Sequence, residues 1–213
     1  MLTIQTNAMK NLIVLALFLF IGHSVFAQKT QSDVFNTNDV VFYGLDFSKA
    51  RFIGTEGFKN PPLLKNSFFN SWNHLLVNER DKYSIEEFFG KTNVEYDISA
   101  VEERNQTPKV EDLVINKSYT LPQSETAAMV KALKTDQKEG IGLVFIVESY
   151  SKFAENGTMY VTFFDIANKE ILLQKKMSGK AGGFGFRNYW SATVFSVLKE
   201  CKKAYPRWMK GKD

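Results

Sequence analysis

IGLVFIVESY, residues 141–150, is almost continuously apolar and rich in β-branched residues. A run of this length and composition is typical of a strand that is buried on both faces of a sheet. Two further candidate strands follow, MYVTFFDI at residues 159–166 and a third at residues 170–177. Turn signals, Asn-Gly at 156–157 and Asn-Lys at 168–169, separate these runs, so they are predicted to form an antiparallel meander.

The chain before this meander alternates strand and helix signals. Residues 39–47 (DVVFYGLDF) and 93–98 predict two strands. Asn60, followed by two prolines, predicts the start of a helix, and Ser84 opens a capping box before a shorter one. Residues 100–119 show weak periodicity and are predicted to be a loop.

A helix is predicted after residue 122 and another from about residue 188 to residue 204. The predicted order is therefore β-α-(α)-β-α-β-β-β-α. This order indicates a single α/β domain, a layered sandwich with a mixed sheet of about five strands and three to four helices. Because the strands at 141–150 and 159–166 are apolar on both faces, helices must cover both faces or a second subunit must cover one. We expect a partly open face that forms a homodimer.

The N-terminal stretch MKNLIVLALFLFIGHSVFA, residues 9–27, has the three-part pattern of a secretory signal peptide. Lys10 precedes the apolar run, which is shorter than the about 20 residues that span a bilayer. Cleavage between Ala27 and Gln28 would leave one domain, residues 28–213. Because Gln28 is not a cysteine, we expect no lipid anchor, and the protein is predicted to be periplasmic or secreted.

Charge and composition exclude several function classes. The formal net charge is +4 at pH 7, with basic and acidic residues interspersed, so no basic patch points to nucleic acid. After cleavage, His74 and Cys201 are the only residues of their kinds. A zinc site of the usual His and Cys types and a His-based catalytic triad are therefore not expected. No cofactor and no metal is predicted.

Carboxylates are the remaining candidates for catalysis. Asp46, Glu148 and Asp165 each lie in or at the end of a predicted strand. Two acids about 5–9 Å apart could hydrolyse a glycoside. A small carboxylate-dependent hydrolase of the cell envelope is therefore one alternative function.

The segment SGKAGGFGFRNYW, residues 178–190, joins the last predicted strand to the last helix. It is neither a Walker A loop, which would need glycine where Gln174 stands, nor a dinucleotide fingerprint, which would need glycine in place of Asn188. Exposed N–H groups at a helix N-terminus favour an anion, and an arginine there adds to the field. The segment is thus a candidate recognition loop, and its candidate residues are Lys180, Phe184, Phe186, Arg187, Asn188 and Tyr189. In the alternative reading it is a tight turn whose phenylalanines fill the core.

Three phrases carry a resemblance to a known group of proteins: VVFYGLDFSKARFIG (40–54), VTFFDIANKEIL (161–172) and GKAGGFGFRNYW (179–190). The chain resembles secreted proteins of unknown function from Bacteroidetes-type Gram-negative bacteria. More distantly, the end of the chain is similar to periplasmic domains of the TolB N-terminal and curli-secretion type, which are α/β protein-interaction modules. Related domains occur in lipoproteins that activate penicillin-binding proteins. The resemblance implies a fold and no activity.

These observations together predict a secreted, non-enzymatic binding protein whose partner is a protein or small ligand of the cell envelope. The alternatives are the small hydrolase and a structural or assembly component of an envelope complex. An extensive apolar interface would mark the assembly component, and acids that converge in one cleft would mark the hydrolase.

Overall fold

Strand β5 (Ile141–Ser151) is the central strand of the sheet, and all eleven of its residues are buried. The computed structural model describes residues 28–212, and the predicted signal peptide lies outside these residues. The other strands are β1 (Asp39–Asp46), β2 (Arg51–Ile53), β3 (Asn93–Tyr96), β4 (Val114–Ile115), β6 (Asn156–Asp165) and β7 (Ile171–Lys180). The α-helices are α2 (Gln31–Asn36), α3 (Pro61–Leu63), α4 (Phe69–Asn78), α5 (Arg80–Tyr83), α6 (Ile85–Phe89), α7 (Ser99–Asn105), α8 (Gln123–Lys131) and α9 (Phe186–Trp208).

The seven strands form only five rows, because β1 and β2 lie one after the other in one row and β3 and β4 lie one after the other in another. One edge of β5 pairs with β1 along its first half and with β2 along its last three residues, both in parallel. Strand β3 lies parallel to β1, and β4 lies parallel to β2. The other edge of β5 pairs with β6, and β6 pairs with β7, both antiparallel. The rows are therefore β3/β4, β1/β2, β5, β6 and β7.

The mixed α/β class predicted from the sequence is confirmed, but the finer description needs correction. The sheet has seven strands, and the described residues contain more helices than the three to four predicted. Antiparallel pairing is confined to β5, β6 and β7, and every other pair is parallel. The predicted loop at residues 100–119 was wrong, since it holds most of α7, a 3₁₀ turn η3 (Val110–Asp112) and β4. These elements are too short to show a period.

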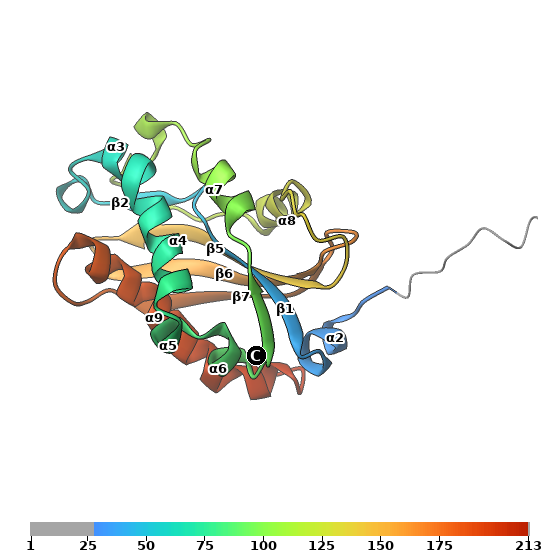
Figure 1. Cartoon of the computed structure of the whole chain (residues 1–213). Coiled ribbons are helices and arrows are strands. Elements are labelled where there is room, and N and C mark those ends of the chain that lie inside the picture. The colour runs from blue at the N-terminus through green and yellow to red at the C-terminus, as the bar shows by residue number, and fades with distance from the viewer. Residues whose placement is uncertain (1–27, 213) are drawn as a thin grey trace, which may run out of the picture.

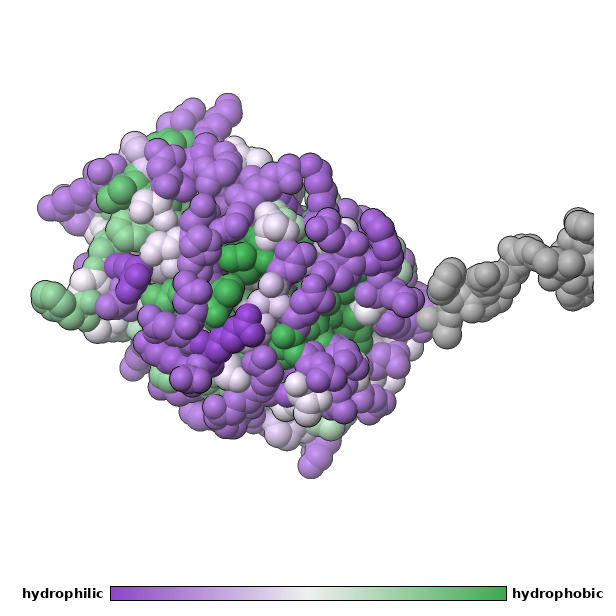
Figure 2. Space-filling model, in the orientation of Figure 1, coloured by the Kyte–Doolittle hydropathy of each residue, from purple (hydrophilic) through white to green (hydrophobic). Residues whose placement is uncertain are grey.

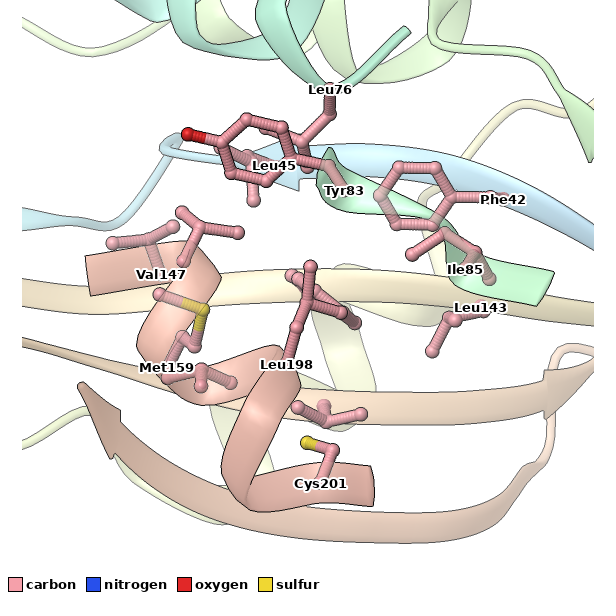
Figure 3. Close-up of a cluster of buried hydrophobic side chains, with 14 of the residues drawn as sticks. Phe42, Leu45, Leu76, Tyr83, Ile85, Leu143, Val147, Met159, Leu198 and Cys201 are labelled. Carbon is pink, nitrogen blue, oxygen red and sulfur yellow. The ribbon is translucent and has the colours of Figure 1, made fainter. Parts of the chain in front are cut away.

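Helices cover both faces of the sheet (Figure 1). Helices α4, α5, α6 and α9 bury one face, and α7 and α8 bury the other. Figure 3 shows part of the core on the first of these faces, which includes Leu198 and Cys201 of α9, Val147 of β5 and Met159 of β6. Strand β5 and most of β6 are thus buried within one chain, so the partly open face that we expected over these two strands is not found in residues 28–212. The homodimer stays a prediction.

Two buried asparagines complete the hydrogen bonding where β1 ends. On the edge that faces away from β5, no strand of the described residues pairs with residues 45–47, which lie between the ends of β3 and β4. Asn73 of α4 accepts a hydrogen bond from the Leu45 N–H (2.7 Å) and donates one to the Leu45 carbonyl (3.0 Å). Asn105 of α7 accepts from the Phe47 N–H (2.7 Å) and donates to the same carbonyl (3.0 Å). Both side chains are fully buried, so they take the place of a neighbouring strand.

The N-terminal helix α2 is held to the core by a buried lysine. Lys91 is 5% exposed, and its Nζ donates to the carbonyls of Val34 (2.5 Å) and Thr37 (2.8 Å). The ammonium also lies 5.6 Å from the centre of the Tyr205 ring. These contacts cap the C-terminal end of α2.

This burial predicts a pH dependence of stability at alkaline pH. Burial lowers the pKa of Lys91 from 10.5 to about 8. Between these values the unfolded chain binds a proton that the folded chain does not, so the free energy of unfolding contributed by this group rises with pH. Below pH 8 both states carry the charge and the contribution is constant. Urea unfolding at pH 7.5 and at pH 10 measures the free energies of unfolding of the wild type and of Lys91→Met. Relative to the variant, the wild type should be more stable at pH 10 than it is at pH 7.5. A pH-independent difference would contradict this.

Candidate functional site

Three segments from distant parts of the chain meet at one end of the molecule, which we call the loop end. They are residues 54–64 after β2, residues 152–155 between β5 and β6, and residues 181–189, which follow β7 and include the first turn of α9. They lie at the left of Figure 1. The Ala181 N–H donates to the Glu155 carbonyl at 2.8 Å, which joins the last two segments. The first segment joins them through Gly57, where an added Cβ would lie 2.6 Å from the Lys152 side chain.

The loop end exposes large apolar side chains. Phe184 is 97% exposed, Phe153 is 69% exposed and Leu63 is 43% exposed. Figure 2 shows apolar residues, in green, at this end of the surface. A single exposed apolar residue needs no explanation, but a group of them on neighbouring loops is typical of an interaction site.

Two hollows lie beside these side chains. One has a volume of about 310 Å³ and is lined by Phe58, Leu63 and Phe68 among others. The second, of about 320 Å³, is lined by Tyr189 and Trp190 among others. Both hollows include Gly57 and Phe186 in their walls. Each is at the lower limit for small-molecule pockets, about 300–1,000 Å³, and suits one bulky side chain of a partner.

The first hollow lies at an irregularity in a helix. The helix that begins at Pro61 contains a π-helical segment, η2 (Leu64–Phe68), before it continues as α4. The Asn60 side chain caps its start by accepting from the Leu63 N–H at 3.3 Å, as its sequence predicts. Single π-helical turns are frequent at functional sites.

The predicted recognition loop divides into an inward and an outward set. Phe186 packs against buried aromatic rings, including Trp190 and Phe58. Tyr189 donates to a Glu155 carboxylate oxygen at 3.0 Å. The outward residues are Lys180, Phe184, Arg187 and Asn188, which are all exposed. Phe186 therefore fills the core, and the four outward residues are the candidates for recognition.

The charge at the loop end is positive. Glu56 pairs with Lys59 (3.6 Å), and Glu155 pairs with Lys152 (3.2 Å). The hydrogen bonds from Tyr189 and Lys152 lower the pKa of Glu155, which keeps it ionised. Within residues 28–212, Lys180 and Arg187 have no ion-pair partner. They leave two positive charges free to attract an anion.

Each of the three candidate acids has its own cation, and Asp165 lies far from the other two. Asp46 and Glu148 are closer together, because the residue of β5 opposite Asp46 is Ile146. Asp46 pairs with Arg104 at 3.2 Å, Glu148 with Lys176 at 2.8 Å and Asp165 with Lys29 at 3.0 Å. On β5, the position opposite Asp165 is five residues from the position opposite Asp46. At about 3.3 Å per residue this is about 17 Å along the strand, which exceeds the separation that glycoside hydrolysis needs.

These acids have structural contacts instead. Asp46 accepts from the Ser48 N–H at 2.9 Å, and Glu148 accepts from the Leu121 N–H at 2.8 Å. Asp165 accepts from the Ala167 N–H at 3.1 Å, at the turn between β6 and β7. Asp165 does line a hollow of about 650 Å³ beside Lys29 and Glu170. Neither Asp46 nor Glu148 lines it, so the hollow does not bring the candidate acids together.

The remaining reactive side chains are also accounted for. His74 is exposed and pairs with Glu102 at 2.7 Å. Cys201 is buried, and burial raises the pKa of its thiol, so it acts as a small apolar residue. Among residues 28–212, no cluster of three or more His, Cys, Asp or Glu could hold a metal ion. Over the same range, no helix has the length and apolar character needed to cross a membrane.

Comparison with known proteins adds no neighbour to these observations. No family model, curated protein or solved structure matches the chain. The resemblance to secreted Bacteroidetes-type proteins and to TolB-type domains therefore stays a prediction.

Proposed function

We propose that this chain is a secreted, non-enzymatic binding domain that holds a partner protein at its loop end. The observation that carries the proposal is Phe184, which is 97% exposed and lies between Gly183 and Gly185, two residues that line one of the aromatic hollows. Binding energy at protein interfaces is concentrated in a few aromatic and arginine side chains that become desolvated in the complex. Phe184 and Arg187 are side chains of this kind on one loop.

The chemistry of the loop end indicates the chemistry of the partner. The hollows fit bulky apolar side chains, and Lys180 and Arg187 attract carboxylates. A protein segment that carries both meets these requirements. A small ligand fits these two hollows less well, because each is near the lower size limit for a ligand pocket.

The alternatives have less support. The hydrolase needs acids that converge in one cleft. Asp165 is about 17 Å from Asp46 along the sheet, and Asp46 and Glu148 are each bound to their own cation and to a backbone N–H. The assembly component needs an extensive apolar interface. In residues 28–212, the exposed large apolar side chains are Leu63, Phe153, Phe184 and Met209, which form one small group and one distant residue. Secretion itself rests on the signal pattern of residues 1–27.

Site-specific photo-cross-linking in the source organism tests the proposal. A photoreactive phenylalanine is introduced at position 184, at 153, or, as a control, at 209, which is 54% exposed beyond α9. We expect one cross-linked product from positions 184 and 153 and none from 209. The product should disappear when Lys180→Glu and Arg187→Glu are added. Equal cross-linking from all three positions, or a product that survives the charge reversal, would contradict the proposal.

A further inference from the structure

Strand β7 forms one edge of the sheet. It pairs with β6 only, and the register from Leu173 to Lys180 is uninterrupted. The Ala181 N–H donates to the Glu155 carbonyl, which extends this register by one pair. In an antiparallel ladder hydrogen-bonded pairs alternate with pairs that are not bonded. From Leu173 to Lys180, the odd-numbered residues of β7 therefore bond to β6, and the even-numbered residues direct their backbone groups away from it.

The outward backbone groups belong to Gln174, Lys176 and Ser178. The next one, the Lys180 carbonyl, accepts from the Ser196 hydroxyl at 3.1 Å, as expected for an outward group. Within residues 28–212, no backbone hydrogen bond satisfies the outward groups of the other three residues. Such a row of free donors and acceptors is a template for an added strand.

The charge along β7 indicates which kind of strand could pair with this edge. Its sequence, ILLQKKMSGK, contains no acid. Lys176 is paired with Glu148 at 2.8 Å, whereas Lys180 and, in the segment that follows, Arg187 have no ion-pair partner within residues 28–212. A second copy of β7 would bring the same positive charges to this edge, and like charges opposite one another are destabilising. An acidic segment is complementary to this edge.

The edge leads directly to the loop end, since β7 stops at Lys180 and the next residue is joined to Glu155. We propose that the partner is held through an extended, acidic segment that adds a strand to β7 and places its bulky apolar residues at the loop end. This inference rests on the proposed function, because the same partner contacts both surfaces. It adds the mode of recognition, which is strand addition.

Proline at an outward position tests strand addition without disturbing β6. Ser178→Pro removes an outward N–H, and edge strands tolerate proline where the N–H faces solvent. Ser178→Ala keeps the N–H and is the matched control. The probe is a phage-displayed library of twelve-residue peptides, selected on the chain comprising residues 28–213. We expect the selected peptides to alternate apolar with Asp or Glu. Compared with the wild type, Ser178→Pro should bind these peptides about tenfold more weakly, because hydrogen bonds are lost. Ser178→Ala should bind them with unchanged affinity.

Amide hydrogen exchange gives a second readout that does not depend on the proline variant. On peptide binding, exchange at Gln174, Lys176 and Ser178 should slow. Selected peptides that are not acidic, no selected peptide, or equal binding to Ser178→Pro would overturn strand addition. Peptides that lose affinity for Phe184→Ala but not for Ser178→Pro would leave the proposed function standing and remove this inference. The opposite pattern would remove the loop end as the site.

Discussion

Asn73→Ala is expected to lower the free energy of unfolding by about 3 kcal/mol. The amide of Asn73 makes three buried hydrogen bonds, two to Leu45 and one to the Phe69 carbonyl at 3.1 Å. Without it, the Leu45 N–H has no partner and no access to water. Each orphaned buried group costs about 1–3 kcal/mol, and the lost packing adds to this.

Urea unfolding followed by tryptophan fluorescence measures this change. Asn78→Ala is the matched control, since Asn78 is an exposed residue of the same helix, and its effect should lie within about 0.5 kcal/mol. A loss below about 1 kcal/mol for Asn73→Ala would mean that Asn73 does not substitute for a strand.

Asn73 and Asn105 should also be coupled. The Leu45 carbonyl accepts from both amides, so either single variant leaves it one donor. In the double variant it loses both, and the loss of stability should exceed the sum of the two single losses. A strictly additive result would indicate that each asparagine acts alone.

Phe184→Ala is expected to weaken partner binding by about thirtyfold or more, the effect of an interface hot spot, with no change in stability. Phe184 is 97% exposed, so the folded chain loses little packing when it is removed. Phe186→Ala should behave differently. Its ring lies 4.5 Å from that of Phe68 and 6.1 Å from that of Phe58, centre to centre. Its loss should lower the free energy of unfolding by about 2 kcal/mol.

The two variants separate recognition from core filling, because they lie two residues apart in one loop. Calorimetric titration with the cross-linked partner, once isolated, measures affinity, and thermal unfolding measures stability. Met209→Ala controls for the loss of an exposed apolar side chain elsewhere. A large fall in melting temperature for Phe184→Ala, or unchanged binding, would assign the whole loop to the core.

The sequence predicts the long, strongly patterned elements well. The apolar run at 141–150 becomes β5, and the turn signal at 168–169 lies between β6 and β7. The turn predicted at 156–157 was wrong, because Asn156 and Gly157 are the first paired residues of β6 and the turn lies at residues 152–155. The cap at Ser84 is confirmed, since its hydroxyl accepts from the Glu87 N–H at 3.0 Å. In these segments local propensity and tertiary packing favour the same structure.

The missed elements are those whose shape depends on distant residues. Strand β2 has three residues and β4 has two, which is too short for a period-2 pattern. They exist because β5 is long enough to pair with β2 after β1 has ended. The roles of Asn73 and Asn105 could not be predicted either, because an asparagine within a helix usually faces solvent.

The candidate site was predicted only in part. The glycines and aromatics of residues 178–190 indicate an unusual loop, but the sequence does not show that Phe153 and Leu63 lie near it. Phe153 belongs to the turn between β5 and β6, and Leu63 belongs to the segment after β2. The acids were predicted as candidates from their strand positions, and pairing along β5 keeps Asp46 and Asp165 apart.

Hydrogen exchange of the chain with and without its cross-linked partner tests the central claim most directly. The account predicts slower exchange at residues 54–64, 152–155 and 181–189 when the partner is bound. It predicts no change in exchange around α8, which packs on the face of the sheet opposite to α9. Protection centred on α8 or on the Asp165 hollow, with the loop end unchanged, would contradict the account.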